Sequence, residues 1–141
     1  MKDCRKELIK ALITALKTAL GTSIKIYTKV PKGDFSNPVA FPFVYITDIE
    51  DSEDGTKSQF IYDYRLTIEI VYSGLSDKAV IWETANKVKG IFNNCVPFAL
   101  GDDLQIMKTE MTGTSESEDL IGSMEVDVIR VGVNFTIEDN N

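Results

Sequence analysis

Histidine is absent from the 141 residues, and cysteine occurs twice, at Cys4 and Cys95. Without histidine the chain cannot build a Ser-His-Asp triad, a Cys-His dyad, an HExxH zinc site or a C2H2 zinc finger. Two cysteines so far apart form neither a CxxC pair nor a disulfide framework, and they are typical of a protein in a reducing compartment. The composition therefore excludes most catalytic and metal-binding classes.

Long apolar runs and motifs for nucleotide or acyl chemistry are also missing. No stretch approaches the roughly 20 apolar residues that a transmembrane helix needs, and the patterns GxxxxGK[ST], GxGxxG and GxSxG do not occur. Asp63 and Glu69 lie on the solvent-facing, polar side of a predicted strand, which gives no indication of an acid–base role in catalysis. We therefore expect no enzyme activity, no metal and no cofactor.

The acidic segment at 48–55 suggests a calcium loop, but its spacing does not fit one. With Glu50 first, Ser52 and Asp54 fall on ligand positions and Gly55 on the turn glycine. The twelfth position is then Ile61 instead of the bidentate glutamate, and no helix pair flanks the segment. A metal-dependent enzyme built on the acidic loops is therefore the weakest hypothesis.

Basic residues are outnumbered, with 15 Lys and Arg against 22 Asp and Glu, so the net charge is −7. Such a chain is poorly suited to wrapping DNA, which requires phosphate neutralisation. The charge is segregated, because residues 1–32 carry a net +6 and residues 33–141 a net −13. This segregation suggests head-to-tail contacts between copies or an acidic partner. Alternatively, Lys6, Lys10 and Lys17 form the solvated face of one helix.

Two segments have the apolar spacing of amphipathic helices, 4–20 and about 77–94. Asp3 is the predicted N-cap of the first helix, and Gly21 is the residue that ends it. Ser76 is the predicted N-cap of the second helix. Trp82 falls at the polar margin of its apolar face.

Alternating residues predict strands over 24–27, 43–47, 60–72, 104–111 and about 121–137. In the last strand the apolar set changes from even to odd positions near Ile129, which suggests a bulge. Loops are expected at 31–41, 48–58 and 113–120.

The order α-β-β-β-α-β-β predicts an α+β fold, in which two helices pack on one face of a mainly antiparallel sheet. No repeat or linker divides the chain, so we expect a single domain over residues 1–141.

Aromatic and charged side chains in exposed positions are the candidates for an oligomer or partner interface. Phe35 and Phe41 lie in the long predicted loop, and they could equally fold back over the sheet. The full candidate set is Lys6, Lys10, Lys17, Phe35, Phe41, Glu50, Asp51, Glu53, Asp54, Trp82, Glu116, Glu118 and Asp119.

The whole layout resembles phage tail terminator or tail completion proteins. The resemblance rests on an N-terminal helix of the type ELIKALITALKTAL, the proline-led strand FPFVYI, the long strand YRLTIEIVYS and the Ser-capped helix SDKAVIWETANKVKGIF. The resemblance covers nearly the full length of the chain. It depends on the order of the elements and on the kind of residues in each, since no single residue is diagnostic.

This resemblance implies a structural virion protein that forms a homo-oligomeric ring, commonly a hexamer. The ring would cap the tail tube, end its polymerisation and join it to the neck or head-completion protein. DNA would pass through the lumen without specific binding, and carboxylates around the pore would repel its phosphates. The protein would be made in the host cytoplasm and reside in the virion, at the head-proximal end of the tail.

Two other functions are compatible with the same residues. One is a different head-tail connector or neck ring subunit. The other is a non-viral monomeric adaptor that binds a protein partner through a sheet edge or the surface around Trp82.

Overall fold

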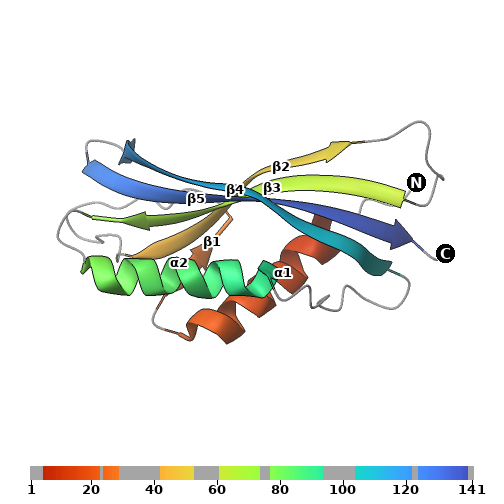
Figure 1. Cartoon of the computed structure of the whole chain (residues 1–141), viewed down its shortest axis with the longest axis horizontal. Helices are drawn as coiled ribbons and strands as arrows, with labels where there is room; N and C mark the ends of the chain where they lie inside the picture. Colours follow the sequence, from red (N-terminus) through yellow and green to blue (C-terminus); the bar gives the residue numbers. More distant parts are fainter. Residues whose placement is uncertain are drawn as a thin grey trace.

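The computed structural model describes residues 5–22, 24–28, 42–52, 61–73, 77–93, 104–121 and 124–139. Within these ranges two helices lie on the same face of a five-stranded sheet (Figure 1). The elements are α1 (Arg5–Leu20), β1 (Lys25–Tyr27), β2 (Phe43–Ser52), β3 (Ile61–Tyr72), α2 (Lys78–Asn93), β4 (Leu104–Ile121) and β5 (Met124–Asp139). The predicted α+β fold and element order are confirmed.

Helix α1 forms because leucines recur every four residues along one face. Leu8, Leu12 and Leu16 are all completely buried. The helix ends at Gly21, which has a positive φ of 78° and whose backbone N–H donates to the carbonyl of Lys17 at 2.9 Å. Gly21 thus ends the helix as predicted, because glycine adopts this left-handed conformation without steric strain.

Helix α2 begins at Lys78, and its N-cap is Asp77. The Asp77 carboxylate accepts a hydrogen bond from the backbone N–H of Ala79 at 2.9 Å, and its carbonyl accepts one from Ile81 at 3.1 Å. These are the contacts of an N-cap residue. The cap therefore lies one residue later than predicted, and Ser76 lies outside the described residues, as does Asp3 before α1.

The sheet has the strand order β1-β2-β3-β5-β4. The β1–β2 pair is parallel, and the other three pairs are antiparallel. After α2 the chain returns as β4 at one edge, and β5 then inserts between β4 and β3. Strands β1 and β4 are therefore the two opposite edges of the sheet.

The main core lies between the sheet and the helices. Even-numbered residues of β3 from Tyr64 to Tyr72 and odd-numbered residues of β5 from Ile129 to Ile137 point into it, together with the buried faces of α1 and α2. Phe92 of α2 meets Phe135 of β5 edge to face, with ring centroids 5.9 Å apart. This pair connects the second helix to a central strand of the sheet.

The predicted bulge in the last strand is wrong. Pairing between β3 and β5 continues without interruption from Ile61 opposite Glu138 to Tyr72 opposite Asp127. Val126 and Val128 belong instead to a second buried cluster with Phe43 and Val71, which lies on the sheet face away from the helices. The apolar residues of β5 change from even to odd positions near Ile129 because both faces of the sheet are apolar around Val126 and Val128.

One predicted loop, 113–120, is also wrong, and another, 48–58, is wrong in part. Residues 48–52 continue β2, and residues 113–120 lie inside β4. These residues are mostly polar, so they lack the alternation of polar and apolar residues that predicts a strand. Backbone pairing nevertheless holds them in the sheet, for example Glu50 opposite Arg65 and Ser115 opposite Arg130. Irregular pairing occurs in β2 between Thr47 and Glu50 and twice in β4. The remaining loop residues, 31–41 and 53–58, lie outside the described ranges.

Candidate functional site

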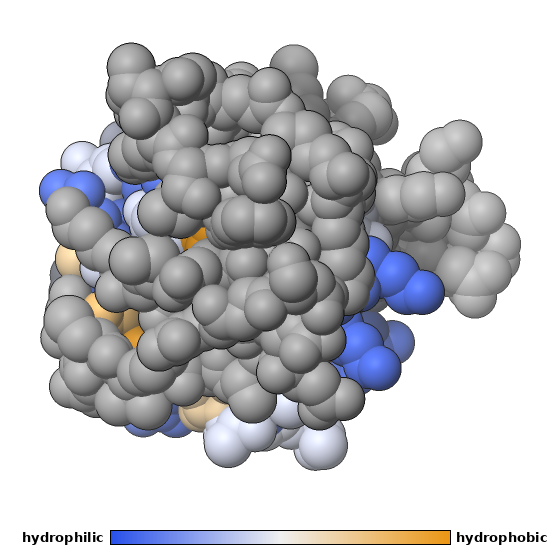
Figure 2. Space-filling view, turned by 90° about the vertical axis from the view of Figure 1, so that its right-hand side faces the viewer, coloured by the Kyte–Doolittle hydropathy of each residue, from blue (hydrophilic) through white to orange (hydrophobic). Residues whose placement is uncertain are grey.

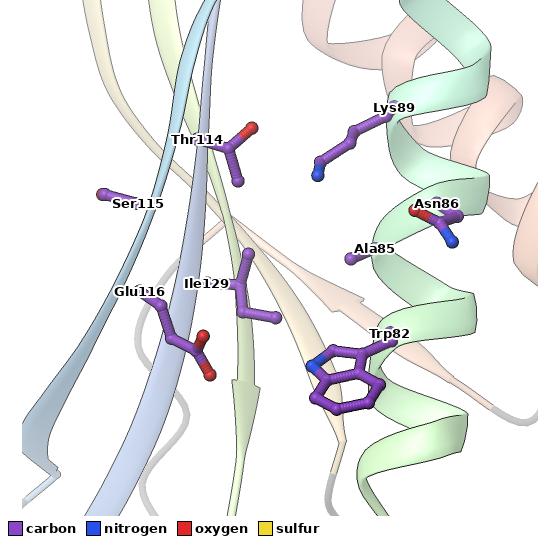
Figure 3. Close-up of a pocket in the computed structure, with 8 residues that line it drawn as sticks. All are labelled: Trp82, Ala85, Asn86, Lys89, Thr114, Ser115, Glu116 and Ile129. Atoms are coloured by element: carbon purple, nitrogen blue, oxygen red, sulfur yellow. The ribbon is translucent and has the colours of Figure 1, made fainter.

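A groove of about 290 Å³ separates α2 from β4 (Figure 3). Residues of α2 form one wall, residues of β4 form the other, and Ile129 of β5 contributes between them. The lining residues are Trp82, Ala85, Asn86, Lys89, Thr114, Ser115, Glu116 and Ile129. The groove joins segments that are more than 20 residues apart in the sequence.

Trp82 is the largest apolar side chain at this groove. Ile81, Ala85 and Val88 form the buried side of α2. Trp82 lies about 100° from Ile81 around the helix axis. The indole is therefore 57% exposed, and it leans toward the strands in Figure 3. The predicted position at the margin of the apolar face is confirmed. An exposed tryptophan is a typical feature of binding surfaces.

Glu116 is fixed on the β4 wall by Tyr72 of β3. The Tyr72 hydroxyl donates to Glu116 Oε1 at 2.5 Å, and Tyr72 is only 4% exposed. Burial raises the pKa of Tyr72 well above its usual range, and the hydrogen bond to Glu116 and the negative charges of Glu116 and Asp127 raise it further. Tyr72 therefore remains a neutral donor and holds the Glu116 carboxylate in place.

This contact predicts a loss of stability in alkali. Below about pH 10 tyrosine is protonated in both states, so the contribution of Tyr72 to stability is complete. As the pH rises further, Tyr72 ionises in the unfolded chain before it can ionise in the folded one, and the free energy of unfolding falls. Ultraviolet titration should show a late-ionising tyrosine that disappears in Tyr72→Phe. An unchanged titration curve in that variant would contradict the assignment.

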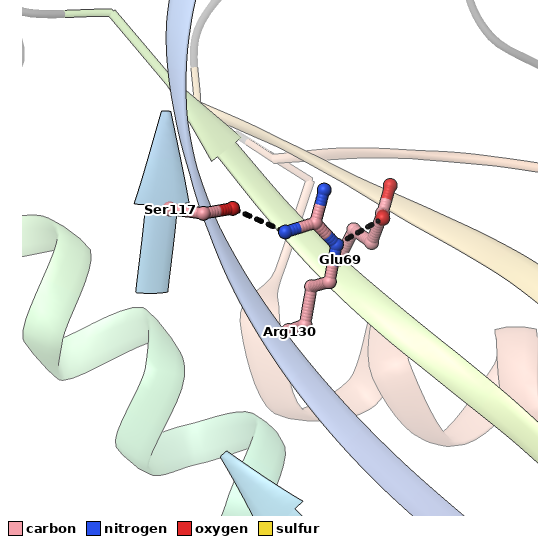
Figure 4. Close-up of polar contacts among 3 residues, drawn as sticks. All are labelled: Glu69, Ser117 and Arg130. Atoms are coloured by element: carbon pink, nitrogen blue, oxygen red, sulfur yellow. Dashed lines mark hydrogen bonds and ion pairs between the residues drawn. The ribbon is translucent and has the colours of Figure 1, made fainter. Parts of the chain in front are cut away.

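A second polar network lies on the opposite face of the sheet (Figure 4). Arg130 Nε donates to Glu69 Oε1 at 2.9 Å, and their side chains are 32% and 16% exposed. The Arg130 guanidinium also donates to the hydroxyl of Ser117. Because Glu69, Arg130 and Ser117 come from β3, β5 and β4, the network connects three strands and helps to place β4. Sequence reasoning missed it, since the pairing register is needed to bring these residues together.

The predicted site residues fall into three groups. Lys6, Lys10 and Lys17 are exposed on α1, and Glu116 and Glu118 are exposed on β4. Glu50 and Asp51 belong to β2 and Asp119 to β4, where the structure describes only their backbone. Phe35, Phe41, Glu53 and Asp54 lie outside the described residues. Of the predicted set, the structure brings Trp82 and Glu116 together at one groove.

Among the described residues no three Cys, Asp or Glu side chains gather in a way that could hold a metal ion, and no helix there is long and apolar enough to cross a bilayer. On the face drawn in Figure 2, the coloured residues are mostly hydrophilic, with small hydrophobic areas toward one side. The observation that points to an interaction surface is the exposed Trp82 beside the groove.

Comparisons with known proteins give a likeness in fold. No protein-family model matches the chain, and no curated protein matches it significantly in sequence. A chain from the solved structure "Virion of native gene transfer agent (GTA) particle" is similar with a TM-score of 0.65 and 16% identity, over 93% of this chain and 94% of that one. A second solved structure is similar with a TM-score of 0.53 and 14% identity, over 93% and 92% of the two chains. Over 93% of its length, the chain thus has a fold similar to that of a chain in a virion particle.

Proposed function

We propose that this protein is a structural component of a phage-like virion, and specifically a tail terminator that forms a homo-oligomeric ring on the tail tube. The observation that carries the proposal is the likeness in fold to a chain of the gene transfer agent virion, which extends over nearly the full length of both chains. The resemblance of the sequence to tail terminators supports the finer assignment. Residues 1–141 act as one unit, and the role requires no catalysis and no cofactor.

Charge segregation in the fold supports assembly from identical subunits. Lys6, Lys10 and Lys17 are exposed on α1, and they lie within about 40° of one another around the helix axis. Glu116 and Glu118 are exposed on β4, at the sheet edge opposite to β1. Two different, complementary surfaces on one subunit favour head-to-tail contacts, which close into a ring when the rotation between subunits permits it.

The net charge of −7 also suits a channel for DNA. Carboxylates around a lumen repel phosphates, so DNA could pass without sticking to the wall. The ring would contact the tail tube protein on one side and a neck or head-completion protein on the other. Its place would be the head-proximal end of the tail, with sixfold symmetry the expected form.

Three measurements test the assignment. Light scattering coupled to size-exclusion chromatography should show a concentration-dependent oligomer, and negative-stain micrographs should show rings. Added to polymerising tail tube protein, the rings should stop elongation. Rings that leave tube growth unchanged would favour another head-tail connector, whereas a strict monomer with and without tube protein would contradict the proposal and favour a monomeric adaptor.

A further inference from the structure

We propose that the groove between α2 and β4 receives the lysine face of α1 from a second copy of this chain. This inference rests on the proposed ring-forming function, and it names the two surfaces that meet. The lysine face consists of Lys6, Lys10 and Lys17, and the acceptor consists of Trp82, Glu116 and Glu118.

The two surfaces lie on different elements of the subunit. Helix α1 packs on α2 and β1, whereas the other helix, α2, packs on β3, β4 and β5. The groove lies beside β4, at the sheet edge opposite to β1, and β1 is the strand that α1 contacts. A contact between them is heterologous, which is the type of contact that builds a closed ring.

The acceptor is acidic on the side of the sheet that faces the helices. Glu116 pairs with Ile129, which belongs to the main core, and Glu118 pairs with Asp127. Directly opposed residues share a face, so Glu116, Glu118 and Asp127 lie on the same face of the sheet as the groove, and Glu116 lines it. Lys89 of the facing wall supplies one positive charge, so the acceptor remains net negative.

Charge spacing on the two surfaces also matches. Lys6 and Lys10 are four residues apart, which is about 6 Å along a helix. Glu116 and Glu118 are two residues apart, which is about 7 Å along a strand. Two lysines of one copy can therefore meet two carboxylates of the next with little change in either backbone.

Trp82 supplies the apolar part of the acceptor. A lysine has a long aliphatic stem that packs on apolar surface and a charged end that is attracted to the face of an indole. The half-exposed Trp82 lies across the groove from Glu116 (Figure 3), and Tyr72 holds that carboxylate in place. A lysine entering the groove would meet the ring and the carboxylate together, and it would cover the apolar surface that the single subunit leaves exposed.

The only tryptophan in the chain provides a direct probe. As the protein associates, Trp82 emission should shift to shorter wavelength and become less accessible to a soluble quencher. Glu118→Lys, which alters no contact described within the subunit, should raise the dissociation constant about tenfold or more. Glu116→Lys should do the same, although it also removes the Tyr72 contact. Combining Glu116→Lys and Glu118→Lys with Lys6→Glu and Lys10→Glu reverses both sides of the contact and should recover much of the lost affinity.

Glu83→Lys is the matched control, because Glu83 is an exposed carboxylate of α2 that pairs with Lys87 outside the groove. This inference would be overturned if oligomers form with unchanged Trp82 emission and Glu118→Lys has the same dissociation constant as Glu83→Lys. The proposed ring function would not be affected by that result. Failure of the native protein to associate at any concentration or with tail tube protein would overturn both.

Discussion

Replacement of Phe135 by alanine should lower the free energy of unfolding by about 3–5 kcal/mol, the usual effect of truncating a fully buried aromatic residue. Phe135 is completely buried in β5, which pairs with strands on both sides. It also meets Phe92 of α2 edge to face. The substitution therefore removes apolar contacts within the sheet and the contact that connects α2 to it. Urea unfolding followed by far-ultraviolet circular dichroism would measure the change.

Val80→Ala is the control for this experiment. Val80 lies on α2 and is 45% exposed, so its truncation should change the free energy of unfolding by about 0.5 kcal/mol or less. A Phe135→Ala variant that is as stable as Val80→Ala would contradict the position of β5 at the centre of the core. The comparison separates a packing effect from a general effect of shortening a side chain.

Elements with one buried face could be predicted closely from the sequence. The leucine spacing of α1 and the alternation in β3 are direct consequences of packing one side against a core. The expected ranges 4–20 and 60–72 therefore differ by one residue at one end from Arg5–Leu20 and Ile61–Tyr72. The same reasoning placed Trp82 at the polar margin of α2.

Strands without a clear buried face could not be recognised in this way. Residues 112–118 of β4 are exposed or half-exposed, so no alternation of polar and apolar residues marks them. Their strand conformation comes from backbone pairing with β5, which is a tertiary interaction. The acidic end of β2 has the same cause, since Glu50 and Asp51 pair with Arg65 and Tyr64 of β3.

The groove could not be predicted without knowledge of the strand order in the sheet. Trp82 and Glu116 were both candidates by type, but their meeting depends on β4 lying at the sheet edge beside α2. Sequence spacing carries no information about that placement, because β5 could equally have formed the edge. The Tyr72 hydrogen bond to Glu116 was missed for the same reason, as its two residues are 44 positions apart.

Leu12→Ala should lower the free energy of unfolding by about 2–5 kcal/mol, because it leaves a cavity beneath the centre of α1. Leu12 is completely buried, and α1 is packed on α2 and β1. Thr14→Ala on the exposed side of the same helix is the matched control. Its hydroxyl donates only to the carbonyl of Lys10, so its loss should change stability by about 0.5 kcal/mol or less. Thermal unfolding would compare the two variants.

A comparison of Leu12→Ala with a charge-reversal variant of the lysine face separates folding from assembly. Leu12→Ala leaves Lys6, Lys10 and Lys17 in place, so at a temperature where the variant is folded its association should stay within about threefold of the native protein, a difference below about 0.7 kcal/mol. Lys6→Glu with Lys10→Glu should give the opposite result, with nearly native stability because both side chains are exposed, and weakened association. If instead Leu12→Ala abolishes association while it is fully folded, the exact placement of α1 matters more than its charge, and the electrostatic basis of the contact is wrong.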